Sequence, residues 1–384
     1  MRAVVLGGGV VGEAVAWDLS RLSPTADVTV VDYDAARLAD LGRRLGVPTR
    51  QADLRDLDAL APLLAGADVS IGTLPSTLAL PVITWMARHG RRHVDVSFLA
   101  DDPRRSHDEA IASSATIVYD CGVAPGLSHV LLAHGARGLR DVDALIDVGG
   151  LPVDPQPPFF YKAPFAPADV LEEYTRPARL VRNGQPLTLP ALSEPETIAV
   201  LGVGPLEAFN TDGLRSLVDT VPAVALLERT LRYPGHLAAM RILSEAGLFD
   251  TTPVQVGDLA VTPRDVTAAV LFPRWQYTPG ERDLTVLRVV VRGRSADGQW
   301  HDVTWTMVDR PEAGSPLSSM ARTTGCPAAI VARWLADGRV RTPGVHPPEF
   351  LGFEGHAEVL LAALALRGIS FQTDARHHES HTLT

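Results

Sequence analysis

The first third of the chain alternates short apolar segments with segments of helical periodicity. Ala3 to Leu6 is a continuous apolar run of the kind that forms a strand buried on both faces of a sheet. Between residues 11 and 19 apolar positions recur at helical spacing, and a second apolar run follows at Val28 to Val31. The pattern therefore predicts a strand, a helix and a second, parallel strand in succession.

The same alternation continues to about residue 119. Further helices are predicted at residues 35–45, 56–66, 83–88 and 108–114, and further strands at 48–53, 68–71, 93–97 and 116–119. Strands separated by helices in this way predict a doubly wound parallel sheet of the Rossmann type, in the α/β class.

From about residue 141 the pattern becomes typical of a mixed or antiparallel sheet. A strand is predicted at 143–148, and residues 286–291 and 300–307 flank an Asp297-Gly298 turn as in a hairpin. Helical periodicity returns from residue 318. We therefore expect a Rossmann domain at 1–140, completed by 318–375, with an inserted α+β substrate and dimerisation domain at 141–317.

Residues 376–384 contain three histidines, at positions 377, 378 and 381. The segment resembles a metal-binding tract in composition alone, because it lacks cysteine and a fixed helical frame. We interpret it as a flexible tail and predict no metal site.

Composition narrows the class of protein. Hydrophobic residues make up 46% and charged residues 21% of the 384 residues, which is typical of a globular protein. A net charge of −10 argues against nucleic acid as a partner. Two cysteines, no leader sequence and no membrane-length apolar run predict a cytoplasmic protein that acts on a small molecule.

The turn after the first strand carries a glycine fingerprint, Gly7-Gly8-Gly9-Val10-Val11-Gly12. In this motif Gly7 permits the tight turn, Gly9 lets the backbone approach a pyrophosphate, and Gly12 allows the helix to pack closely on the strand. Asp32 follows Gly12 by twenty residues at a strand end, where a carboxylate can bind the adenosine ribose and repel a 2′-phosphate. The sequence thus predicts NAD as cofactor. Arg37 is the one nearby residue that would instead favour NADP. The alternative for the glycine motif is an ordinary glycine-rich turn that binds no cofactor.

Other residues fall at the same carboxyl edge of the predicted sheet. Asp53 is placed to bind the adenine, and the segment 72–76 to cover the phosphates or the nicotinamide ribose, unless it is an ordinary Pro-containing turn. Besides the fingerprint and Asp32, the expected cofactor contacts are Tyr33, Asp53, Leu54, Thr73, Leu74, Pro75 and Ser97. The turn 120–126 would face the nicotinamide, with Cys121 and Gly122 beside the substrate; for Cys121 we expect proximity, and simple packing is the alternative.

Polar residues in the second half suit a substrate pocket. Arg232 is the best candidate for holding a substrate carboxylate, because a guanidinium binds a carboxylate through two parallel hydrogen bonds; an arginine on the surface is the alternative. The same set of polar residues contains Tyr161, Lys162, Asn210, Asp212, Arg215 and His236.

Taken together, several motifs resemble the saccharopine dehydrogenase (glutamate-forming) superfamily, and within it most closely the L-lysine 6-dehydrogenases. The motifs are GGGVVG at 7–12, VDYD at 31–34, DCGVAPGLSH at 120–129, VGGLP at 148–152, YKAPFAP at 161–167, ERTLRYPGH at 228–236, SPLSSMARTTGCPAAI at 315–330 and GVHPPE at 344–349. The first is weakly specific and the others are strongly specific in combination.

The resemblance implies NAD-dependent oxidative deamination at the ε-carbon of lysine by a homodimeric enzyme without a metal. Hydride passes to NAD⁺, water attacks the imine, and ammonia leaves with allysine, which cyclises to a piperideine carboxylate. The chemistry requires an acceptor for the protons of the amine and of the water. The candidates are Asp95, Lys162, Asp212 and His236.

Two other interpretations stay open. One is a related enzyme that forms or cleaves a C–N bond, such as a saccharopine or carboxynorspermidine dehydrogenase; the apolar surroundings of Tyr161, at 157–160 and Phe165, favour the smaller substrate instead. The other is an NAD-binding protein without catalytic activity, because fold alone does not establish function.

Overall fold

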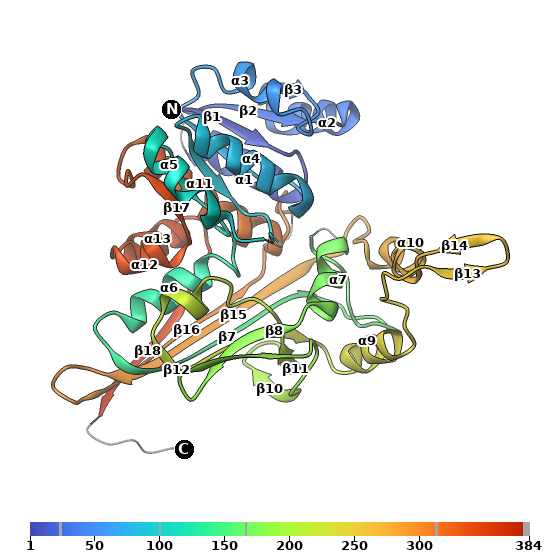
Figure 1. The fold of residues 1–384 in the computed structure, drawn as a ribbon, viewed down its shortest axis with the longest axis vertical. Coiled ribbons are helices and arrows are strands. Elements are labelled where there is room, and N and C mark those ends of the chain that lie inside the picture. The colour runs from blue at the N-terminus through green and yellow to red at the C-terminus, as the bar shows by residue number, and fades with distance from the viewer. Residues whose placement is uncertain (23–24, 100, 166, 312–313, 379–384) are drawn as a thin grey trace. The chain divides into compact units, whose positions relative to one another are not determined.

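The computed structural model describes residues 1–22, 25–99, 101–165, 167–311 and 314–378, and it divides the chain into two compact units (Figure 1). The first unit contains Met1–Val130 and Ala321–Ile369; the second contains Leu131–Met320 and the segment from Ser370. The chain crosses between the units near residues 130, 320 and 369, where the sequence pattern predicts crossings near residues 140, 318 and 375.

In the described part of the chain, the first unit is built on a parallel sheet of seven strands in the order β17-β6-β5-β4-β1-β2-β3. The strands are β1 (Arg2–Leu6), β2 (Asp27–Asp32), β3 (Thr49–Gln51), β4 (Val69–Gly72), β5 (Arg92–Asp95), β6 (Thr116–Val118) and β17 (Gly344–His346). The helices are α1 (Val10–Leu22), α2 (Ala35–Leu45), η1 (Leu57–Ala59), α3 (Leu60–Leu63), α4 (Ser76–Arg88), η2 (Pro103–Ser106), α5 (His107–Ser113), α11 (Ser319–Ala336), α12 (Glu349–Phe353) and α13 (Ala357–Ala365), while α6 (Leu127–Ala136) leads into the second unit.

The C-terminal segment is fixed to the first unit by close packing and by a buried ion pair. A Cβ added to Gly325 in α11 would lie 2.9 Å from the Cβ of Ala14 in α1, so the two helices touch at a residue without a side chain. The Arg367 guanidinium donates to both oxygens of Asp18, at 2.5 and 2.8 Å. Because both side chains are buried, each charge depends on the other for its stability.

The second unit is built on a mixed sheet that follows the path β10-β11-β12-β7-β15-β16-β18, with β8 and β9 joined to β12. Its strands are β7 (Arg140–Pro152), β8 (Ala178–Arg182), β9 (Gln185–Leu189), β10 (Glu196–Val200), β11 (Gly204–Asn210), β12 (Ala223–Arg232), β15 (Asp283–Arg294), β16 (Trp300–Asp309) and β18 (Gln372–His378). Helices α7 (Pro167–Thr175), α8 (Leu217–Thr220), α9 (His236–Glu245) and α10 (Pro263–Trp275) and a separate hairpin of β13 (Val254–Val256) and β14 (Leu259–Val261) complete the unit (Figure 1).

The predicted fold class, a Rossmann sheet together with a mixed-sheet domain, is confirmed. The predicted hairpin is also present: β15 pairs antiparallel with β16, from Thr285 opposite Asp309 to Arg294 opposite Trp300. Strand β7 lies between β15, to which it is antiparallel, and β12, to which it is parallel. No described helix is long and apolar enough to cross a membrane.

Two strands at sheet edges differ from the sequence analysis. Strand β17 extends the Rossmann sheet beyond β6 and was not predicted, because it is three residues long and lies between Pro343 and Pro347. Residues 376–378, expected in a flexible tail, belong to β18, which pairs with β16. The remainder of that predicted tail, 379–384, lies outside the described residues.

Candidate active site

The glycine turn at the start of the first unit is shaped by sterics. Gly7 has a φ of 107°, and a Cβ added to it would lie 2.7 Å from the carbonyl oxygen of Thr73. At Gly12 an added Cβ would lie 2.0 Å from the carbonyl oxygen of Gly7, whereas at Gly9 it would meet nothing within 4 Å. Gly7 and Gly12 therefore allow the strand, turn and helix to approach one another, and Gly9 leaves the backbone open at the N-terminus of α1, where Val10 and Val11 begin the helix.

Asp32 connects the end of β2 to this turn. Its Oδ2 accepts a hydrogen bond from the Gly8 amide at 2.6 Å, and its Oδ1 accepts one from the Asp34 amide at 2.9 Å. The guanidinium of Arg37 lies 3.7 Å from Oδ2 and is about half exposed. The Asp32 carboxylate thus lies next to the glycine turn, as expected, and the positively charged Arg37 guanidinium lies next to the carboxylate.

The segment after β4 also reaches the turn. The Thr73 amide donates to the Leu6 carbonyl at 2.8 Å, and its hydroxyl lies 3.1 Å from the carbonyl oxygens of both Leu6 and Gly7. The Ser97 hydroxyl donates to the Leu74 carbonyl at 2.8 Å, and Pro75 precedes α4. Thr73 therefore lies against the glycine turn, and Leu74, Pro75 and Ser97 follow β4 and β5 at the carboxyl edge of the sheet.

The three other predicted cofactor contacts differ in their environment. Tyr33 is 67% exposed, next to Asp32. Asp53 is held by Arg55, whose hydrogen bonds lower the pKa of the Asp53 carboxyl to about 2. The side chain of Leu54 belongs to the hydrophobic core, so only its backbone is left for a cofactor.

Asp95 is not exposed at the surface of the unit, where a proton acceptor would need to lie to reach substrate or solvent. The side chain is fully buried; its Oδ1 accepts from the Ser97 amide at 2.8 Å, and its Oδ2 lies 3.4 Å from Nε2 of His93 on the same strand. The Asp95 carbonyl accepts from the Cys121 amide, which joins β5 to the turn at 120–126. Burial raises the pKa of the Cys121 thiol, as expected for a packing residue, and Gly122 packs on Thr324.

In the second unit, two predicted catalytic residues are held in ion pairs. The Lys162 ammonium donates to the Gln276 carbonyl at 2.9 Å and to Glu281 at 3.0 Å. Asp212 is buried and accepts two hydrogen bonds from the Arg179 guanidinium, at 2.8 and 3.0 Å. Asp212 therefore fixes β8 to the loop after β11, which is a structural role.

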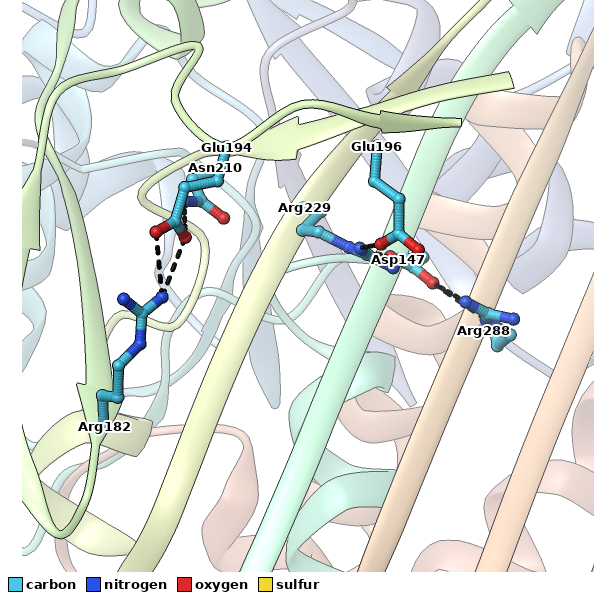
Figure 2. Close-up of polar contacts among 7 residues, drawn as sticks. All are labelled: Asp147, Arg182, Glu194, Glu196, Asn210, Arg229 and Arg288. Atoms are coloured by element: carbon cyan, nitrogen blue, oxygen red, sulfur yellow. Dashed lines mark hydrogen bonds and ion pairs between the residues drawn. The ribbon is translucent and has the colours of Figure 1, made fainter. Parts of the chain in front are cut away.

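Figure 2 shows further charged side chains held in ion pairs around β12. Arg229 donates to Asp147 at 2.8 Å and also to Glu196, and Arg288 binds the other oxygen of Asp147 at 2.5 Å. Asn210, a predicted substrate ligand, donates to Glu194, which also binds Arg182. Arg215, another predicted ligand, is buried with a φ of 53°. Asp147, Arg229, Arg288 and Asn210 thus hold strands and loops of the second unit together.

Arg232, at the end of β12, lies among aromatic and acidic side chains. Its Nη2 donates to Glu173 at 2.5 Å, its Nε donates to the Tyr174 hydroxyl at 3.3 Å, and its guanidinium carbon lies 4.6 Å from the centre of the Tyr161 ring. Only 2% of Arg232 is exposed. We call Tyr161, Glu173, Tyr174, Arg232 and His236 the Arg232 cluster.

His236 begins α9 and is fully buried in this cluster. The Phe159 carbonyl can only accept, so we assign the proton to Nδ1, which donates at 2.8 Å; Nε2 then accepts from the Tyr174 hydroxyl at 2.8 Å. Burial, with Arg232 nearby, lowers the pKa of His236 to about 3. A neutral imidazole with this pKa orients Tyr174 and is a poor proton acceptor at neutral pH.

Sequence reasoning missed Glu173, Tyr174 and Glu228. Glu228 lies on β12 and is 4% exposed; it accepts from the Thr211 hydroxyl at 2.6 Å and from the Gly213 amide at 3.0 Å. Burial raises the pKa of its carboxyl to about 8. The available signal was the alternation of polar residues in a strand that is otherwise apolar. Glu228, Thr230 and Arg232 lie two residues apart and therefore share one face of β12.

Comparison with known proteins places this arrangement in a class. The chain matches the saccharopine dehydrogenase NADP binding domain over residues 3–118 and the saccharopine dehydrogenase C-terminal domain over residues 122–369. The fold and the glycine turn thus define a Rossmann-type oxidoreductase. The chain belongs to the saccharopine dehydrogenase family, which confirms the superfamily resemblance seen in the motifs.

Individual relatives are distant in sequence. The chain is 24% identical to saccharopine dehydrogenase [NADP(+), L-glutamate-forming] of Saccharomyces cerevisiae, over 90% of the chain and 93% of the relative. It superposes on the apo structure of L-Glu-forming saccharopine dehydrogenase from that yeast with a TM-score of 0.80 and 22% identity, covering 98% of the chain and 99% of that structure. For a homospermidine synthase of Legionella pneumophila in complex with NAD, the TM-score is 0.66 at 11% identity, covering 99% and 92%.

Replacing Gly9 tests the cofactor turn. Because an added Cβ meets no neighbour, Gly9→Ala should leave the free energy of unfolding within about 0.5 kcal/mol of wild type. If the backbone approaches a pyrophosphate here, the Kd for NADH should rise at least about tenfold, measured by fluorescence titration. An unchanged Kd would remove Gly9 from the phosphate site; Gly12→Ala, which should also lose stability, separates the two effects.

The buried Glu228 predicts a pH dependence of stability. Its folded pKa of about 8 lies above the ordinary glutamate pKa of 4.5, so the native state holds an extra proton between these pH values. The stabilisation is complete below pH 4.5 and is lost as the pH rises through about 8, with a slope of at most about 1.4 kcal/mol per pH unit. Urea unfolding at several pH values should show a flatter dependence for Glu228→Gln; an identical slope would contradict the assignment.

Proposed function

We propose that this protein oxidises a carbon–nitrogen bond of an amino-acid substrate and passes the hydride to a nicotinamide dinucleotide. One observation carries the proposal: a chain with a dinucleotide-type glycine turn also buries Arg232, a carboxylate-binding guanidinium, among aromatic side chains. The names of the curated relatives, which are dehydrogenases of saccharopine, point to the same type of bond.

For the substrate we propose L-lysine, oxidised at the ε-carbon to allysine with release of ammonia. Saccharopine contains the same carbon, but its leaving amine is glutamate, which brings two further carboxylates. In the second unit the buried guanidinium groups of Arg229 and Arg232 already have carboxylate partners, Asp147 and Glu173. Because both guanidinium groups are already matched by the protein, little positive charge is left for three substrate carboxylates; we therefore propose the smaller substrate, with its one carboxylate at Arg232.

For the cofactor we propose NAD. The Asp32 carboxylate beside Gly8 disfavours the 2′-phosphate of NADP by charge repulsion. The yeast relative is named for NADP(+), and Arg37 is placed where it would attract a phosphate. The proposal rests on Asp32 lying closer to the glycine turn than Arg37 and being buried, so that its charge is less screened.

The proton acceptor needs a group that solvent or substrate can reach. Of the four residues predicted for this role, Asp95, Asp212 and His236 are buried and hydrogen-bonded within their own units, whereas the Lys162 side chain is 20% exposed. We therefore retain Lys162 in the proposal; because its ammonium group donates to Glu281 and Gln276, it must release a proton before it can accept one. No group of three or more metal-binding side chains is present among the described residues.

Absorbance at 340 nm tests substrate and cofactor together. We expect L-lysine with NAD⁺ to give the largest kcat/KM, exceeding that with NADP⁺ at least about tenfold, which corresponds to about 1.4 kcal/mol. L-saccharopine, carboxynorspermidine and diamines are compared under the same conditions. A larger value with saccharopine would overturn lysine as substrate, a larger value with NADP⁺ would overturn the role of Asp32, and no reaction with any amine would favour a non-catalytic NAD-binding protein.

We also propose that the protein is a homodimer and that the β13–β14 hairpin contributes to the contact. Val254 pairs with Val261 and Val256 with Leu259, so four apolar side chains share one face of a hairpin that pairs with no other described strand. Val256 and Leu259 are 59% and 69% exposed. An isolated hairpin is marginally stable in water, and exposed apolar faces mark interaction sites.

Light scattering after size-exclusion chromatography tests this contact. Val256→Lys combined with Leu259→Lys should reduce a dimeric mass to a monomeric one, because each lysine would be desolvated in the contact. Gln255→Lys, on the opposite face of the same hairpin, should remain dimeric. A monomeric wild type, or a dimer in all three proteins, would contradict the proposal.

The cytoplasmic location stays a proposal. Cys121 and Cys326, both buried and unpaired, are compatible with a reducing compartment.

A further inference from the structure

A cavity of about 320 Å³ lies within the first unit, against one face of the parallel sheet. Its lining comes from β1, β2 and β3 and from the segment 62–67, which contains the end of α3 and leads to β4. Among the described residues, the lining includes none of the glycine turn at 7–12 and none of the Arg232 cluster. Small-molecule sites usually measure about 300–1,000 Å³, so the cavity can hold a small ligand away from both of those places.

The cavity is present because the connection between β3 and β4 contains little helix. The helices η1 and α3 have three and four residues, whereas α1, which connects β1 to β2, has thirteen. The helix of a parallel crossover normally covers one face of the sheet. Here the amino ends of β1, β2 and β3 stay open on that face, at the opposite end of the strands from the glycine turn.

The interior of the cavity is mostly apolar. Val4 pairs with Thr29 in register, and Thr29 and Val31 are two positions apart on β2, so the three side chains share one face of the sheet. Leu63 and Ala65 cover this face from the other side of the cavity. Val4, Val31 and Leu63 are less than 9% exposed and belong to one hydrophobic cluster, while Thr29 adds a single hydroxyl. This interior suits an apolar body.

The rim of the cavity carries two guanidinium groups and one carboxylate. Arg50 donates to the Pro62 carbonyl at 3.5 Å, and no ion pair joins it to a carboxylate in the described part of the chain. Arg2 lies over Gly66, where an added Cβ would be 2.5 Å from its Nη1, and its Nε lies 3.9 Å from the Asp27 carboxylate. Both partners of that ion pair are more than half exposed, so the pair is weak. One positive charge is thus in excess at the rim.

We propose that this cavity binds a small monocarboxylate with an apolar body, separately from the dinucleotide and from the amino-acid substrate. The carboxylate binds Arg50 and Arg2 at the rim, because a guanidinium matches a carboxylate through two parallel hydrogen bonds. The apolar body lies between Val31 and Leu63. A dianion such as a phosphate monoester is disfavoured, because the Asp27 carboxylate lies on the same rim and offsets one of the two positive charges.

Fluorine-19 NMR titration with 4-fluorobenzoate tests the site in the full-length protein, alone and with saturating NADH and L-lysine. We expect 4-fluorobenzoate to bind at least about fivefold more tightly than the uncharged 4-fluorobenzamide, and no less tightly than the dianion 4-fluorophenyl phosphate. Arg50→Gln should weaken 4-fluorobenzoate about tenfold and Arg2→Gln about threefold to tenfold, because each removes a charge-assisted hydrogen bond. The affinity for 4-fluorobenzamide should change less than about twofold in either variant.

A matched variant controls for the loss of a surface charge. Arg43→Gln removes an exposed guanidinium of α2 that pairs with Asp40 and does not line the cavity. It should bind 4-fluorobenzoate as wild type does. Because Arg2, Arg43 and Arg50 are all exposed, each variant should keep the melting temperature of wild type, which thermal unfolding verifies.

Several results would reject the site. They are an affinity for 4-fluorobenzoate that Arg50→Gln leaves unchanged, an equal loss in Arg43→Gln, equal binding of the carboxylate and the amide, and displacement of 4-fluorobenzoate by NADH or L-lysine. Tighter binding of 4-fluorophenyl phosphate would overturn the monocarboxylate as the ligand class. The site goes beyond the proposed function and does not depend on it, so a failure of lysine oxidation leaves these outcomes unaffected.

Discussion

Strand β12 imposes the main physical constraint on the second unit, because it buries charged side chains on both faces at the centre of a sheet. Glu228 and Arg232 lie on one face and Arg229 lies on the other, and all three are less than 9% exposed. A buried charge without a partner destabilises a protein by several kcal/mol, so the two arginines must be matched, whereas Glu228, with a pKa raised to about 8, is held by Thr211 and Gly213. The neighbouring elements are placed accordingly: β7 brings Asp147, β10 brings Glu196 and α7 brings Glu173.

This constraint separates structural charges from functional ones. Asp147 accepts from two arginines and is fully buried, so its bonding capacity is used within the sheet (Figure 2). Arg232 donates from each of its three nitrogens, to Tyr174, to the Leu231 carbonyl and to Glu173, whereas one oxygen of Glu173 has no described partner and its side chain is 20% exposed. Incomplete satisfaction of buried polar groups is the physical feature that distinguishes a ligand site from a structural ion pair.

Most of the fold could be predicted from the sequence because its signals are local. The apolar run at residues 3–6 and the glycines after it define the first strand and turn, and the alternation at 286–307 defines a hairpin. Strands β17 and β18 could not be predicted in this way, because they are short or polar and exist by pairing with β6 and β16. Their stability comes from partners far away in the sequence.

The candidate site was less predictable, because the role of a polar residue depends on its partners. Asp32 and Thr73 could be placed at the sheet edge from their position after a strand, and both lie beside the glycine turn. Asp95 and Asp212 both appeared suited to proton transfer from the sequence, yet Arg179 binds both oxygens of Asp212, and Asp95 is fully buried with one oxygen held by the Ser97 amide. Spacing along the chain shows which residues reach an edge, but not which carboxylate an arginine elsewhere has already bound.

The same reasoning explains why the reacting end of the substrate should lie far from its charged head. Around Arg232 the groups suited to moving a proton are constrained: His236 is held neutral by burial, and Tyr174 is bound to both His236 and Arg232. In the proposed function such surroundings hold the substrate's head group, and they are poorly suited to accept the protons that amine oxidation releases. A substrate whose oxidised carbon is several bonds from its α-carbon, as the ε-carbon of lysine is, satisfies both requirements.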